Sequence, residues 1–103
     1  MALIVQKFGG SSVKDAEHLR NVADIVTGTY KSGNDVVVVV SAQGDTTDDL
    51  IDKAKEINRN PSKREMDQLL TAGEQISASL LAMTIEDLGY PVVSLLGLSL
   101  IHI

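Results

Sequence analysis

The chain has 103 residues, and its 44% hydrophobic content is enough for one compact unit with a modest core. A formal net charge of −5, with one Phe, two Tyr and no Trp, argues against binding to nucleic acid or to an anionic membrane. Cysteine is absent, which excludes disulfides, thiolate catalysis and cysteine metal sites. His18 and His102 lie far apart, so we expect no metal site built from side chains. The N-terminus lacks the pattern of a secretory signal, and no apolar run is long enough to span a bilayer, so we expect a cytoplasmic protein.

The first predicted element is a short strand that leads into a glycine turn and then a helix. Residues 2–5 are apolar and end in a β-branched residue, which is typical of a strand. After the glycine pair at 9–10, Ser12 and Asp15 have the spacing of a capping box that begins a helix. Glycine carries no Cβ, so an anion can approach the main chain at the positive end of the helix dipole, and Lys7 adds a positive charge. The pattern fits a phosphate-binding turn, but also a plain tight connection, because it is neither the Walker A nor the dinucleotide motif.

A helix and a second strand are predicted next. Gly33 is expected to end the helix, whose apolar stripe consists of Ala16, Leu19, Val22, Ala23, Val26 and Tyr30. His18 falls off this stripe and is predicted to be a solvated surface histidine. Residues 36–40 are an unbroken run of valine, which predicts a strand buried on both faces within a parallel sheet covered by helices. Since the carboxyl ends of parallel strands lie together, the loops at 7–10 and 41–44 are predicted to flank one crevice.

Two further helices are expected, a short one with its apolar side at residues 50–57 and a long one that ends at Gly89. Capping boxes are predicted to begin them, Thr46 with Asp49 and Ser62 with Glu65. Ser41, Thr46 and Thr47 are interpreted from the residues alone as ordinary turn or cap residues. A second interpretation is that these hydroxyls, at the end of a strand, bind a small polar substrate.

The long helix contains a glycine that is unusual at such a position. A glycine within a helix costs about 1 kcal/mol relative to alanine, so Gly73 indicates a close backbone approach or a break. Its neighbour Glu74 is expected to be tightly packed and to need a cationic partner. Residues 91–95 predict a third strand, and the apolar residues 96–103 are expected to promote association.

Three separated segments together resemble the aspartate kinases, which belong to the amino acid kinase family. They are residues 7–13 (KFGGSSV), 40–48 (VSAQGDTTD) and 70–74 (LTAGE). The resemblance implies an α/β fold, a three-layer αβα sandwich with a mainly parallel sheet, of which this chain is the N-terminal portion. Residues 96–103 depart from the family pattern, with Leu96 where the family carries threonine, so we expect an atypical, non-native end there.

The resemblance implies that the γ-phosphoryl group of ATP is transferred to the side-chain carboxylate of L-aspartate. The product is 4-phospho-L-aspartate, the first intermediate on the way to lysine, threonine and methionine. By resemblance, the catalytic residue is Lys7, the groups that hold the phosphoryl are Lys7, Phe8, Gly9 and Gly10, and the aspartate contacts are Ser41, Thr47 and Glu74. Mg²⁺ would be held through the nucleotide phosphates. The chemistry agrees, because a carboxylate nucleophile is ionised at neutral pH and needs alignment and charge stabilisation rather than a general base.

Two alternatives stay open. The chain is also compatible with another amino acid kinase, acting on glutamate or acetylglutamate, and with a non-catalytic module for anion binding or dimerisation. The expected partners are L-aspartate and ATP, together with a homo-oligomer or an association through the apolar C-terminal region. Because the resemblance covers one wall of the crevice, we expect the 103-residue chain to be inactive by itself.

Overall fold

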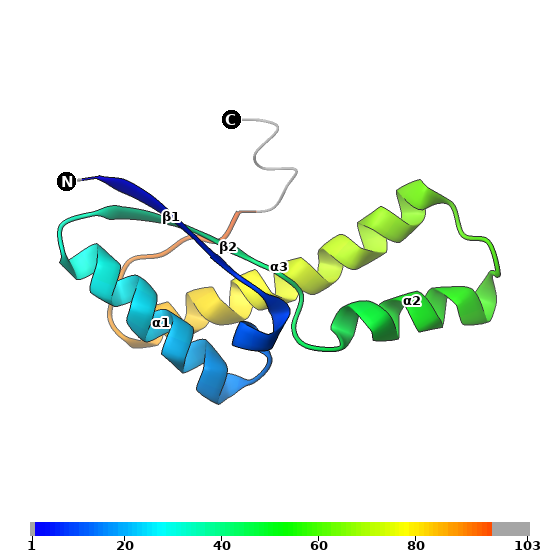
Figure 1. The fold of residues 1–103 in the computed structure, drawn as a ribbon, viewed down its shortest axis with the longest axis horizontal. Helices are drawn as coiled ribbons and strands as arrows, with labels where there is room; N and C mark the ends of the chain where they lie inside the picture. Colours follow the sequence, from blue (N-terminus) through cyan, green and yellow to red (C-terminus); the bar gives the residue numbers. More distant parts are fainter. Residues whose placement is uncertain (1, 96–103) are drawn as a thin grey trace.

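The computed structural model describes residues 2–95, in which two parallel strands are joined through a helix (Figure 1). Strand β1 (Leu3–Phe8) pairs in register along its whole length with β2 (Asp35–Val40). Between them the chain forms a short 3-10 helix, η1 (Gly10–Val13), and then the helix α1 (Ala16–Lys31). The predicted βαβ unit with a parallel sheet is confirmed.

Two further helices follow the second strand. Helix α2 (Thr46–Ile57) and the first half of α3 (Lys63–Asp87) lie side by side beyond the carboxyl ends of the strands (Figure 1). Residues 91–95 have no regular structure, so the predicted third strand is wrong for the described part of the chain. A strand exists only where its backbone groups pair with a neighbour, and the sheet found within residues 2–95 has two strands. Residues 96–103, predicted to promote association, lie outside the described residues.

The hydrophobic core lies between one face of the sheet and the helices α1 and α3. Its buried members are Val13, Leu19, Val22, Ala23, Val26, Leu81 and Ile85, and the sheet contributes Phe8, Val36, Val38 and Val40. The predicted apolar stripe of α1 is confirmed in its middle, whereas Ala16 and Tyr30 at its two ends are exposed.

The opposite face of the sheet is open within residues 2–95, which contradicts the prediction that the valine run is buried on both faces. Burial alternates along both strands, and the apolar side chains of the open face are 46–67% exposed: Leu3, Val5, Val37 and Val39. The physical reason is that α1 and α3 pack on the same side of the sheet. The described residues therefore supply the sheet and one helical layer of the predicted α/β fold.

Helix α1 begins later than the capping box at Ser12 predicts. Ser12 lies inside η1, where its N–H donates to the Gly9 carbonyl over 3.0 Å. The N-cap of α1 is Asp15, whose carboxylate accepts the N–H of His18. A carboxylate is a strong cap at the positive end of a helix dipole.

The other predicted helix ends are confirmed in part. Ser62 caps α3 by accepting the N–H of Glu65 over 3.3 Å, as predicted. Thr46 is the first residue of α2 rather than its cap, and the N-cap position falls on Asp45 without a side-chain bond. After α1 and α3 the chain turns at glycines with φ of +93° at residue 33 and +87° at residue 89, conformations that favour glycine.

No helix within residues 2–95 combines the length and the apolar character that crossing a membrane requires.

Candidate functional site

The loops that follow the two strands are hydrogen-bonded to each other. The Ser41 N–H donates to the Phe8 carbonyl over 3.1 Å, and the Gly44 N–H donates to the Gly10 carbonyl over 3.0 Å. The two loops are therefore neighbours, as predicted, although the structure shows them in direct contact rather than on the two sides of a crevice. Their contact is made by backbone groups, so it fixes the path of both loops whatever their side chains do.

The two glycines of the first loop meet different surroundings. A Cβ at Gly10 would lie 2.5 Å from the carbonyl oxygen of Ala42, so only glycine lets the two loops come this close. A Cβ at Gly9 would meet no atom within 4 Å, and Gly9 is exposed. The backbone at Gly10 is thus occupied by the second loop, whereas the backbone at Gly9 is open to an approaching ligand.

Helix α3 reaches the same point through its central glycine. A Cβ at Gly73 would lie 3.0 Å from the Ala42 Cβ and 3.3 Å from the Thr46 Cγ2, while the helix continues without a break. The predicted close approach is therefore confirmed. Ala42, which is buried, lies between Gly10 on one side and Gly73 on the other.

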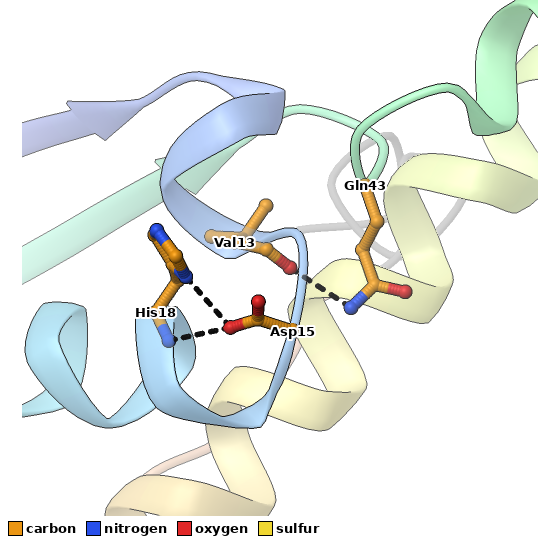
Figure 2. A network of polar contacts seen from close by, with 4 residues as sticks. All are labelled: Val13, Asp15, His18 and Gln43. Atoms are coloured by element: carbon orange, nitrogen blue, oxygen red, sulfur yellow. Dashed lines mark hydrogen bonds and ion pairs between the residues drawn. The ribbon is translucent and has the colours of Figure 1, made fainter.

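A side-chain hydrogen bond also joins the two loops. The Gln43 amide nitrogen donates to the carbonyl oxygen of Val13 over 2.9 Å, in a partly buried position (Figure 2). Gln43 had no predicted role of its own, and the only signal for it in the sequence was the predicted proximity of the two loops.

Next to this bond, Asp15 and His18 form an exposed pair at the start of α1 (Figure 2). The Asp15 carboxylate accepts the His18 N–H over 2.8 Å and lies 2.7 Å from the imidazole Nδ1. These two bonds hold the pKa of Asp15 below its ordinary value of 3.8, and the bond from the His18 backbone N–H has the larger effect. His18 is partly exposed, as predicted for a surface histidine, but its ring is held by a neighbouring carboxylate.

The depressed pKa of Asp15 predicts a specific loss of stability in acid. Because the folded pKa is the lower one, the stabilisation is complete above the unfolded value of about 4 and is lost as the pH falls through the folded pKa. In Asp15→Asn the cap acceptor remains but cannot titrate. We expect the thermal midpoint of the unsubstituted chain to fall more steeply than that of Asp15→Asn as the pH drops below about 4. Parallel curves for the two proteins would contradict this.

The groups predicted to hold phosphate lie at the end of β1. Lys7 is exposed, on the open face of the sheet that also carries Val5 and Val39. Phe8 faces the other way, its side chain packs against the core, and its carbonyl accepts the Ser41 N–H. The structure therefore gives Phe8 a packing role, and leaves Lys7 and the open backbone at Gly9 available to an anion.

The groups predicted to contact aspartate come from three elements. Ser41 follows β2 and Thr47 lies in the first turn of α2, and both are half-buried. Glu74 is exposed, so the expectation that it is tightly packed is wrong. Glu74 comes directly after Gly73, whose backbone faces Ala42. Successive residues of a helix point in different directions around its axis, so the Glu74 side chain points away from that contact.

A groove of about 900 Å³ runs along β2, between α3 and residues 91–95. Glu74 lines this groove together with Thr71 and Gln75. The structure thus brings the three predicted segments together at Ala42, and places Glu74 at the edge of a neighbouring hollow. Within residues 2–95, no group of three or more His, Asp or Glu side chains is arranged to hold a metal ion.

Comparison with known proteins identifies the family. The family model described as the amino acid kinase family matches residues 2–102, and the chain belongs to this family. Within it, the chain is similar to proteins named aspartokinase, which confirms the predicted resemblance. The aspartokinase of Mycolicibacterium smegmatis is 62% identical over 97 residues, which cover 94% of this chain and 23% of that protein. That of Mycobacterium tuberculosis H37Rv is 64% identical over 89 residues, which cover 86% of this chain and 21% of that protein.

The same likeness is found among solved structures. The crystal structure of aspartate kinase from Synechocystis matches with a TM-score of 0.88 and 49% sequence identity, over 90% of this chain and 16% of that one. The predicted fold class is thereby confirmed. The chain spans less than a quarter of the length of the two mycobacterial relatives.

Proposed function

We propose that this chain is the part of an aspartate kinase that binds the γ-phosphoryl group of ATP next to L-aspartate. The side-chain carboxylate of the L-aspartate accepts the phosphoryl group. The product is 4-phospho-L-aspartate, which leads toward lysine, threonine and methionine. The relatives named aspartokinase, at 57–64% identity, support the choice of aspartate over other amino acids.

The observation that carries the proposal is the contact between the two loops at Gly10. Because Gly10 has no Cβ, the loop that bears Ser41 can lie directly against the turn that follows Lys7. A phosphoryl donor and its acceptor have to be held next to each other and in line, because alignment supplies much of the acceleration. The joined loops provide such a pair of adjacent surfaces.

Each residue then has a defined role in the proposed reaction. The aspartate side chain attacks as an ionised carboxylate, so no proton has to be removed. Lys7 and the open backbone at Gly9 stabilise the charge on the transferred phosphoryl oxygens. Ser41 and Thr47 hydrogen-bond the amino acid, and Glu74 pairs with its ammonium group.

Mg²⁺ enters this proposal with the nucleotide. The side chains within residues 2–95 do not form a cluster that fits a metal ion, so we assign none of them as a ligand. The ion would neutralise charge on the ATP phosphates, which it prefers to bind while keeping several waters.

Titration calorimetry with Mg·ATP and with L-aspartate tests the proposal. We expect Lys7→Ala to weaken ATP binding and Glu74→Ala to weaken aspartate binding, each by about tenfold or more, because each removes a charged hydrogen-bonding partner. Lys55→Ala in α2 and Glu86→Ala in α3 are matched controls that remove the same charges elsewhere, and we expect them to leave both affinities unchanged.

The proposal fails if the unsubstituted chain binds neither ligand, or if the control substitutions weaken binding as much. Glutamate and acetylglutamate, titrated in the same way, would identify a different amino acid kinase if either bound more tightly than aspartate. We expect binding without aspartate-dependent ATP consumption, because Lys7 lies on an open face of the sheet, where solvent weakens the charge stabilisation that it can give to the phosphoryl oxygens.

A further inference from the structure

Gln43 connects three elements of the candidate site. Its side-chain amide donates to the carbonyl of Val13, the last residue of η1, over 2.9 Å (Figure 2). Its own carbonyl accepts the N–H of Thr46, the first residue of α2, over 2.8 Å. One residue thus ties the end of the glycine turn to the start of the helix that carries Thr47.

The acceptor of this side-chain bond needs a partner from outside its own helix. Carbonyl groups in the last turn of a helix have no partner within that helix, and a buried carbonyl without a hydrogen bond is destabilising. Val13 is fully buried, so water reaches its surroundings poorly. Since a carbonyl oxygen only accepts, the NH₂ group of Gln43 is the part of the amide that faces it.

The bond adds to two backbone bonds between the same loops. The Ser41 N–H donates to Phe8 and the Gly44 N–H donates to Gly10, on either side of Gln43 in the sequence. The second of these bonds requires glycine at residue 10, because a Cβ there would meet the second loop, but neither bond uses a side chain. Gln43 adds a bond between the loops that depends on its side chain.

We propose that Gln43 is a positioning residue, which holds the loop of Ser41 and the start of α2 in a fixed place relative to the turn that follows Lys7. The inference rests on the proposed function, because it names what keeps the phosphoryl donor and the amino acid acceptor in line. Gln43 touches neither substrate in this role and acts through the backbone of the two loops.

The first test needs no ligand. In Gln43→Met, the volume is nearly kept and the amide is lost. We expect hydrogen exchange at the Gly44 amide to accelerate about fivefold relative to the Val26 amide of α1, as the loss of one hydrogen bond predicts. Gln6→Met is the matched control, since Gln6 also makes one partly buried bond, to Thr29 over 2.9 Å, but from the middle of β1. An unchanged exchange ratio in Gln43→Met would overturn the inference.

The second test separates positioning from mere stabilisation. We expect ATP to raise the aspartate affinity of the unsubstituted chain by about fivefold or more, and Gln43→Met to abolish this effect while each ligand alone binds as before. Equal coupling in both proteins would overturn the positioning role. If the unsubstituted chain bound neither ligand, the proposed function would fail, and the positioning role of Gln43 would fail with it. The hydrogen-exchange result would still show whether the Gln43 side chain stabilises the contact between the two loops.

Discussion

Gly10→Ala is expected to lower the free energy of unfolding by about 3 kcal/mol, the upper end of the range for adding a group where the packing leaves no room. The added Cβ would lie 2.5 Å from the carbonyl oxygen of Ala42, a backbone atom. That loop cannot withdraw freely, because the Gly44 N–H is bonded to Gly10 and Ala42 packs on α3 from the other side. Urea denaturation followed by circular dichroism measures the change.

Gly9→Ala is the control for Gly10→Ala. It should leave the free energy of unfolding almost unchanged and weaken ATP binding. The backbone at Gly9 has φ −77° and ψ 172°, which alanine adopts readily, and a Cβ there meets no atom within 4 Å. We expect the stability to change by no more than about 0.5 kcal/mol. The same Cβ projects over the backbone that the proposed function leaves open to phosphate, so ATP binding should weaken. Equal losses of stability at Gly9 and Gly10 would contradict the account of the two glycines.

Gly73→Ala is expected to destabilise the chain by about 1 kcal/mol, although alanine is the better helix former. The gain in helix propensity is about 1 kcal/mol, and the overpacking against the Ala42 Cβ and the Thr46 Cγ2 is expected to outweigh it at about 2 kcal/mol. Ala42 does not give way easily, because its carbonyl oxygen already lies against Gly10 on the other side. Thermal and urea unfolding measure the net effect.

Gly28→Ala in α1 is the matched control for this second prediction. It makes the same change inside a helix, but its Cβ would meet no atom within 4 Å. We expect it to stabilise the chain by about 0.8 kcal/mol through helix propensity alone. If both substitutions stabilised the chain, the contact of α3 with the second loop would not constrain the fold.

The sequence predicted those parts of the site that depend on chain topology. Parallel strands bring their carboxyl ends to one edge of a sheet, so the proximity of the loops after β1 and β2 could be expected before any contact was known. Gly73 signalled a close approach because a glycine within a helix is otherwise unfavourable. Neither signal depends on a particular side-chain contact.

Other features depend on contacts that a local pattern does not carry. The valine run of β2 was predicted to be buried on both faces, and its actual burial depends on where α1 and α3 pack. Asp15 rather than Ser12 caps α1, because η1 takes up the residues that the capping pattern assigned to the helix. The bond from Gln43 joins residues that are 30 positions apart, and no spacing rule identifies such a pair.

The two loops and the middle of α3 meet around Ala42. Nuclear Overhauser spectroscopy on the labelled chain tests whether they do. We expect cross-peaks between the Ala42 methyl group and the α protons of Gly73, and between the Gly44 amide proton and the α protons of Gly10, because a Cβ at each glycine would lie within 3.4 Å of the partner atom. A spectrum that shows one contact without the other, or neither, would contradict the convergence on which the proposed phosphoryl transfer depends.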